Sequence, residues 1–215
     1  MLPTKTFICP TITADNSDEY YRQLNNVLNF TNRIHIDLAK YPFSPRNLID
    51  VSQITWPDNL MVDCHIMINT PYNDLNNLIK LKPNLVIIHA EASGNFVKIA
   101  DTLHKYNIKV GVGLLRATAP AVLEDVLDTI DHVLIFSGNL GYQGGSMADL
   151  RLLYKVKWLK DKAPNLEIGW DGGINEVNAY RLVSSGVNVL NVGGYIQNSI
   201  NPKQAYANIR RAIKQ

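Results

Sequence analysis

Arg33-Ile34-His35-Ile36-Asp37 is a short run whose composition predicts a β-strand. Alternate residues of a strand point to the same side, so His35 and Asp37 would share one face, about 7 Å apart at a rise of roughly 3.3 Å per residue. An imidazole and a carboxylate placed in this way are common at solvated strand ends. The meaning of this pair therefore depends on what the other strands carry at the same end.

Similar runs recur along the chain, and helical patterns separate them. The predicted strands are 7–10, 33–37, 60–68, 85–89, 109–115, 133–136, 166–170 and 189–192. The predicted helices are 18–29, 71–80, 96–106, 120–127, a long one ending near 162, 175–185 and 202–213, with a short helical or irregular piece at 46–53. Eight alternations with connections too long for hairpins require parallel strands and right-handed crossovers. They predict an α/β fold, a (β/α)8 TIM barrel forming a single domain over residues 1–215. An open doubly wound sheet is the alternative, but no Gly-x-Gly-x-x-Gly turn follows the first strand.

The composition is that of an ordinary globular protein. The 21 basic and 19 acidic residues give a formal charge of +2 without a long run of one sign, so neither nucleic acid nor a membrane surface is an expected partner. The N-terminal Met1-Leu-Pro-Thr-Lys-Thr lacks a signal-peptide pattern, and we expect a cytoplasmic protein. The only cysteines, Cys9 and Cys64, lie in apolar runs and are expected to be buried, reduced thiols.

Polar side chains stand where three predicted strands end. His35 and Asp37 end the second strand, His65 lies near the end of the third, and Asp171 directly follows the seventh. Because the carboxyl ends of barrel strands meet at one mouth, where the active sites of such barrels lie, these four side chains would face each other. Two imidazoles and two carboxylates suit a divalent metal ion, zinc first, with iron, manganese or cobalt as substitutes.

Glycines follow the last three strands. They are Gly138, Gly141, Gly144 and Gly145 after the sixth, Gly172 and Gly173 after the seventh, and Gly193 and Gly194 after the eighth. Their backbone amides would approach an anion without obstruction from a Cβ atom, and a short helix beginning near Gly194 would point its N-terminus at the same place. The pattern predicts a phosphate site, and hence a small molecule that carries a phosphate group as the partner.

These motifs make the chain similar to ribulose-phosphate 3-epimerases over nearly its whole length. The similar segments are Pro10-Thr-Ile-Thr-Ala-Asp15, Ile34-His-Ile-Asp37, Asp63-Cys-His-Ile-Met67, His89-Ala-Glu-Ala92, Gly141-Tyr-Gln-Gly-Gly145 and Asp171-Gly-Gly-Ile174. The resemblance implies a barrel of the ribulose-phosphate-binding type and a homo-oligomer. It implies that His35, Asp37, His65 and Asp171 bind the metal and that Asp37 and Asp171 also form the acid/base pair. The substrate contacts implied are Thr11, His65, Met67, Gly141, Gly144, Gly145, Gly172, Gly173, Gly193 and Gly194.

The implied reaction is the interconversion of ribulose 5-phosphate and xylulose 5-phosphate. A proton would leave carbon 3, next to the carbonyl, and return to the other face of a cis-enediolate. The chain departs from the family at Leu38-Ala-Lys-Tyr41 and at Phe136, where methionines and an acidic residue are usual. A 3-epimerase for a hexulose 6-phosphate such as allulose 6-phosphate, or an inactive sugar-phosphate-binding barrel, is therefore an alternative. Lys40 after Asp37 also suggests a phosphosugar decarboxylase, but without that family's Asp-x-Lys-x-x-Asp spacing.

Other residues of chemical interest are interpreted as structural. His89, with Glu91 just beyond it, is interpreted as a polar strand end, with a place beside the metal ligands as the alternative, and His104 and His132 are expected to be solvated. Tyr20, Tyr21 and Trp158 are expected to pack helices onto the barrel.

Overall fold

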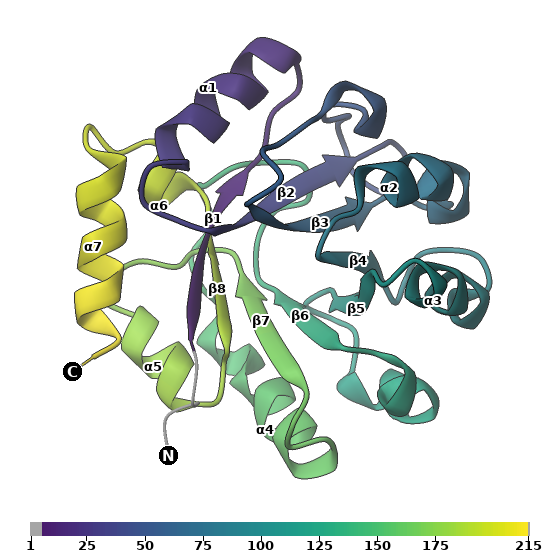
Figure 1. Cartoon of the computed structure of the whole chain (residues 1–215). Coiled ribbons are helices and arrows are strands. Elements are labelled where there is room, and N and C mark those ends of the chain that lie inside the picture. The colour runs from purple at the N-terminus through teal and green to yellow at the C-terminus, as the bar shows by residue number, and fades with distance from the viewer. Residues whose placement is uncertain (1–5, 215) are drawn as a thin grey trace.

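The computed structural model describes residues 6–214, which form a closed barrel of eight parallel strands (Figure 1). The strands are β1 (Phe7–Ile12), β2 (Arg33–Ala39), β3 (Met61–Met67), β4 (Leu85–His89), β5 (Lys109–Leu114), β6 (His132–Phe136), β7 (Glu167–Asp171) and β8 (Val189–Val192). Each strand pairs with the next, and β8 pairs with β1. The predicted (β/α)8 barrel is confirmed. Most of the N-terminal segment used to predict the absence of a signal peptide, residues 1–5, lies outside the described residues.

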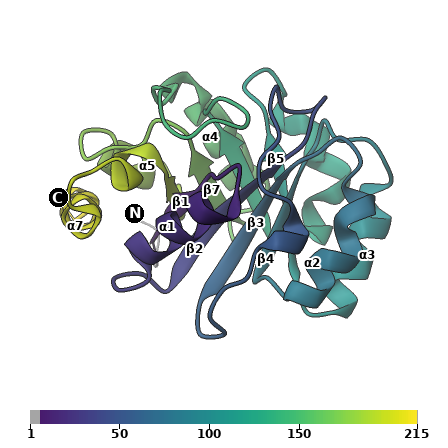
Figure 2. The same ribbon diagram turned by 90° about the horizontal axis from the view of Figure 1, so that it is seen from above.

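Helices surround the ring of strands (Figures 1 and 2). The α-helices are α1 (Ser17–Val27), α2 (Leu75–Leu81), α3 (Phe96–Lys105), α4 (Leu153–Lys162), α5 (Ala179–Ser184), α6 (Gly194–Gln197) and α7 (Pro202–Ala212). The 3₁₀ helices are η1 (Val51–Gln53), η2 (Pro71–Asp74), η3 (Pro120–Thr129) and η4 (Leu150–Leu152). Within residues 6–214, no helix combines the length and the apolar character needed to cross a membrane.

Four helices differ from the prediction. The helix predicted at 71–80 begins as the 3₁₀ helix η2, and the long helix predicted to end near 162 is the ten-residue α4, which begins at Leu153 after η4. The segment predicted as a helix at 120–127 is the 3₁₀ helix η3, whose rise of about 2.0 Å per residue, against 1.5 Å in an α-helix, spans more of the barrel wall with the same number of residues. The helix predicted at 175–185 is shorter, because Asn175 and Asn178 form a hydrogen-bonded turn before α5 begins.

The strands are buried on both faces. In β4, Val86 and Ile88 belong to the apolar layer between the strands and the helices, whereas Leu85 and Ile87 point inward and pack with Leu134 in the centre of the barrel. The helices turn apolar residues toward the strands, and a side-chain cap fixes the N-terminus of three of the four longest helices, α4 being the exception. The cap residues are Asn16 for α1, Asn95 for α3 and Asn201 for α7. Cys9 and Cys64 are buried, as predicted.

The amino-terminal end of the barrel interior holds a cluster of paired charges. Arg33 donates to Asp63 over 2.8 Å and to both carboxylate oxygens of Glu167 over 2.9 and 2.8 Å. The Nδ1 atom of His132 lies 2.9 Å from Glu167, and Asn84 donates to Asp63. The prediction that His132 is solvated is wrong, since its exposed fraction is 1%. Strand β6 begins at this residue, one position earlier than predicted, and the alternation of the strand turns its imidazole inward.

Candidate metal and substrate site

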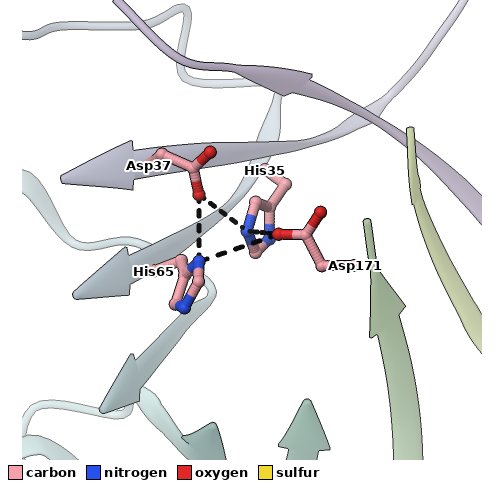
Figure 3. Close-up of side chains that lie close together, drawn as sticks. All are labelled: His35, Asp37, His65 and Asp171. Carbon is pink, nitrogen blue, oxygen red and sulfur yellow. Dashed lines mark hydrogen bonds and ion pairs between the residues drawn. The ribbon is translucent and has the colours of Figure 1, made fainter. Parts of the chain in front are cut away.

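The four side chains predicted to bind a metal meet at the carboxyl end of the barrel interior (Figure 3). The Nδ1 atom of His65 lies 2.9 Å from Asp37 Oδ1, and His35 Nε2 lies 3.3 Å from the same oxygen. Asp171 Oδ2 lies 3.5 Å from His35 Nε2 and 3.8 Å from His65 Nδ1. One nitrogen or oxygen of each residue lies within 4.8 Å of those of the other three.

Strand geometry explains why these four meet. His35 and Asp37 alternate on β2, and the β2–β3 register sets Asp37 beside His65. Asp171 ends β7, which is separated from β2 in the ring by β8 and β1. It therefore approaches the other three from a different side of the barrel, as Figure 3 shows.

The donor set fits a divalent cation. All four residues are buried, and neither ring nitrogen of His35 makes a hydrogen bond, although Nε2 lies close to two carboxylates. A buried imidazole without a partner is unfavourable, whereas a cation beside Nε2 would give that nitrogen a ligand bond. Two imidazoles with two carboxylates are donors that zinc and neighbouring first-row metals accept.

The two carboxyl groups differ in their electrostatic environment. Burial would raise the pKa of Asp37, but the imidazoles of His35 and His65 beside it lower that pKa below its ordinary value. Burial raises the pKa of Asp171, and the negative charge of Asp37 raises it further. Without a cation, one carboxyl group is therefore held ionised while the other accepts a proton more readily.

Three residues that were not predicted to belong to the site support it. The hydroxyl of Thr13 donates to Asp37 Oδ2 over 2.7 Å. His65 Nε2 lies 2.8 Å from His89 Nε2, and His89 Nδ1 lies 3.3 Å from Glu91. The interpretation of His89 as a mere polar strand end is wrong, because its ring is buried against a candidate ligand. If His65 binds a cation through Nδ1, its Nε2 carries the hydrogen atom and donates a hydrogen bond to Nε2 of His89.

A cavity of about 260 Å³ extends from the carboxylates to the glycine-rich loops. Its lining includes Asp37 and Asp171 and nine of the residues predicted to contact substrate, namely Thr11, Met67, Gly141, Gly144, Gly145, Gly172, Gly173, Gly193 and Gly194. His65, the tenth, is fully buried and is not part of this lining. Side chains of Gln143, Ser146, Asn175, Asn191, Tyr195 and Asn198 also line the cavity. None of these six residues was predicted. Five of them lie outside the strand ends on which the prediction relied, and Asn191, which does lie at a strand end, was not singled out.

The loops after β6 and β7 touch backbone to backbone beside this cavity. A Cβ atom on Gly172 would lie 2.2 Å from the backbone nitrogen of Gly138, and one on Gly173 would lie 2.0 Å from that of Ala148. Both glycines also have positive φ values, +106° and +73°. Only glycine is compatible with this approach, which keeps backbone amides close to the cavity.

The structure shows what Phe136 and Lys40 contact, two of the residues at which the chain departs from the motifs of the similar family. Phe136 lines the cavity, and its ring centre lies 5.5 Å from that of His65, so it forms part of the apolar wall with Met67. Lys40 lies outside the cavity lining and is paired with Asp74 at 2.9 Å and Asp50 at 3.1 Å. This position gives no support to a decarboxylase in which that lysine would meet the substrate.

Comparisons with known proteins point to one family. The model of the ribulose-phosphate 3 epimerase family matches residues 7–197. The ribulose-phosphate 3-epimerase of Buchnera aphidicola subsp. Baizongia pistaciae is 32% identical over 176 residues, which cover 80% of this chain and 77% of that protein. The ribulose-phosphate 3-epimerase of Bacillus subtilis is 30% identical over 185 residues, covering 82% and 85%. A crystal structure of 3-hexulose-6-phosphate synthase covers 97% of this chain and 100% of its own with a TM-score of 0.72; at 18% identity, this likeness shows the fold alone.

Proposed function

Because the chain belongs to the ribulose-phosphate 3-epimerase family and is an isomerase, we propose that it interconverts ribulose 5-phosphate and xylulose 5-phosphate. The observation that carries the proposal is the pair Asp37 and Asp171, which reach one cavity from strands that are not neighbours. Inversion at a carbon atom needs one proton-transfer group on each face of the substrate. These two carboxyl groups meet that need.

The cavity gives the substrate one orientation. The loops that carry Gly144, Gly172 and Gly194 would hold the phosphate through backbone amides, which leaves carbons 2 and 3 at the end with Asp37 and Asp171. Binding the phosphate far from the reacting carbon fixes the sugar without blocking the chemistry.

In the proposed reaction, one carboxylate removes the proton from carbon 3 and gives a cis-enediolate. The other carboxyl group, already protonated, returns a proton to the opposite face, and the roles exchange in the reverse direction. Thr13 and His65 hold Asp37 by hydrogen bonds on its two oxygens, so this carboxylate keeps a fixed direction during the transfer. Phe136 and Met67 cover the same end of the cavity with apolar surface, which limits the access of water.

We propose that His35, Asp37, His65 and Asp171 hold a divalent cation, zinc in the first place, with iron, manganese or cobalt as substitutes. When bound, such a cation stabilises the negative charge that develops on the substrate oxygens. We also propose that residues 1–215 act as one barrel domain and that the protein associates with copies of itself, as the family resemblance implies.

The test is metal analysis of the purified protein together with exchange of the carbon 3 proton of ribulose 5-phosphate with solvent, followed by NMR. Wild-type protein should contain a divalent metal and exchange this proton. Asp37→Asn and Asp171→Asn should each slow the exchange by about 10³-fold or more, because a general acid/base is worth 10²–10⁴ and the metal site is weakened as well.

The matched control is Asp161→Asn, since Asp161 is exposed on α4 and pairs with Lys157 on the same helix. It should exchange at the wild-type rate. Full exchange in both active-site variants would contradict the assigned roles. Exchange with allulose 6-phosphate but not with ribulose 5-phosphate would establish the hexulose alternative, and metal and sugar binding without any exchange would establish an inactive binding barrel.

A further inference from the structure

Asn191 is a buried polar residue of the cavity to which the proposed mechanism gives no role. It lies on β8 with an exposed fraction of 2% and lines the cavity. The strand register sets it beside Asp171 of β7 on one side and Cys9 of β1 on the other. Two residues further on, Gly193 begins the last glycine loop. Asn191 thus lies between the acid/base end of the cavity and its glycine end.

The amide oxygen of Asn191 has no hydrogen-bond partner. Among the residues that the structure describes, few buried side-chain atoms share this property, and one of them is the hydroxyl of Thr11, which lines the same cavity. Burying an amide or hydroxyl oxygen without a partner is unfavourable, and native proteins rarely do so unless water or a ligand supplies the bond.

The backbone oxygen of Thr11, in contrast to its hydroxyl, has hydrogen-bond partners. Gln143 donates to the backbone oxygen of Thr11 over 3.1 Å and to the side chain of Gln23 over 3.0 Å. Gln197 also lies near that backbone oxygen, at 3.3 Å. Hydrogen-bonding side chains are thus available next to Thr11, yet its hydroxyl and the amide oxygen of Asn191, both buried in residues that line the cavity, have no partner. This selective lack of partners points to a ligand group.

The position along the cavity indicates which ligand group this is. In the proposed orientation, carbon 3 lies at Asp37 and Asp171 and the phosphate on carbon 5 lies at the glycine loops. Carbon 4 and its hydroxyl group are then level with Asn191 and Thr11. We propose that Asn191, together with Thr11, hydrogen-bonds the carbon 4 hydroxyl and so makes this hydroxyl a requirement for tight binding. The proposal rests on the proposed function, because the substrate orientation comes from it.

The chemistry of the two side chains suits a hydroxyl group. An amide has an acceptor and two donors, and the hydroxyl of Thr11 both donates and accepts. The two side chains can therefore accept a hydrogen bond from a sugar hydroxyl and donate one to its oxygen at the same time. A substrate without this hydroxyl would leave both buried groups unpaired. Sites built in this way reject the deoxy analogue more strongly than an apolar pocket rejects a change of one methylene.

The experiment compares the binding of ribulose 5-phosphate and 4-deoxyribulose 5-phosphate to the metal-loaded protein by calorimetry. Wild-type protein should bind the hydroxylated compound about tenfold more tightly or better. In Asn191→Leu, which keeps a similar shape but removes the amide, the two compounds should bind within about threefold of each other. Asn191→Ala removes the amide without adding bulk and should give the same result if the leucine variant does not fold.

The control is Asn25→Leu on the exposed face of α1, which should keep the wild-type preference. Equal binding of the two compounds to wild-type protein would overturn the proposal, and so would a tenfold preference retained by the folded Asn191 variants. Binding with the expected preference but without exchange at carbon 3 would overturn the epimerase function alone. Failure of wild-type protein to bind ribulose 5-phosphate would overturn both.

Discussion

The barrel interior holds two clusters of charged and imidazole side chains, one at each end, and the same strands supply both. Strand β2 gives Arg33 to the amino-terminal cluster and His35 and Asp37 to the other. Strand β3 gives Asp63 and His65, and β7 gives Glu167 and Asp171. The two clusters have similar residue types and similar burial, but they differ in how completely their hydrogen bonds are made.

At the amino-terminal end, the carboxylates and the guanidinium satisfy one another, and within the described residues of this cluster only Nε2 of His132 is left without a partner. Arg33 makes three hydrogen bonds to two carboxylates, and Asn84 and His132 bond the same carboxylates from other sides. At the carboxyl end, two carboxylates face each other and neither ring nitrogen of His35 has a hydrogen bond. A self-paired cluster stabilises the fold, whereas a cluster that lacks partners is organised for something that binds there. The burial and the charges of the residues would not by themselves have distinguished the amino-terminal cluster from the carboxyl-end cluster.

The largest effect on stability is expected at the amino-terminal end. Arg33→Met would leave Asp63 buried, and Glu167 half-buried, without their cation, and removing one partner of a buried ion pair costs about 3–5 kcal/mol. Urea unfolding of the metal-free protein measures the loss. Asp37→Asn, on the same strand, should cost about 1 kcal/mol or less, because Asp171 still neutralises His35. Equal losses in the two variants would remove the distinction between the clusters.

A smaller effect on stability is expected when a metal ion is added. This effect should depend only on the cluster at the carboxyl end of the barrel. Zinc at one hundred times its dissociation constant should stabilise the folded protein by about 2.7 kcal/mol, and a chelator should reverse this. His35→Leu should abolish the shift, because His35 would supply one of the proposed ligand nitrogens. Arg33→Met, despite its lower stability, should keep it. The measurement is thermal unfolding with and without the metal, and a shift of equal size in His35→Leu would count against the site.

The smallest effect is the loss of stability at acidic pH. Although burial would raise the pKa of Glu167, the hydrogen bonds from Arg33 and His132 lower it below the ordinary 4.5. A carboxyl group whose pKa is lowered by folding contributes stability above its unfolded pKa and loses it as the pH falls. Stability should therefore fall below about pH 4.5, by up to about 1.4 kcal/mol per pH unit for this one group. Glu167→Gln should flatten the profile in denaturant titrations between pH 5 and 3, and an unchanged slope would show that other groups control it.

Much of the fold could be predicted because the strand signal is local. Runs such as Leu85–His89 are apolar on both faces, and only a parallel sheet covered by helices buries a strand in this way. The error at 120–127 has a local cause too, since Pro120 favours the start of either kind of helix and so does not distinguish a 3₁₀ helix from an α-helix.

The candidate metal residues could be predicted because strand ends converge in a barrel. The supporting residues could not, because their roles depend on pairings between strands. His132 and His89 both stand in apolar runs, yet one joins the amino-terminal cluster and the other contacts His65. Asn191 carries no sign in the sequence that its oxygen lacks a partner, since that property belongs to the packed interior. Thr13 was within reach of sequence reasoning, two residues after Thr11 on the same side of the chain.

The pairing of β1 with β8 has a consequence for how the protein is made. The register joins Phe7 to Val189 and Pro10 to Val192, so the first strand to leave the ribosome waits for the last before the ring is complete. Until then β1 and β7 are open edges, able to pair with strands of other chains. The glycine turn at Gly193 follows the closing strand directly, so a nascent chain completes the proposed phosphate site only as these edges disappear. A half-made molecule is thus exposed to aggregation before it has any site with which to hold a sugar.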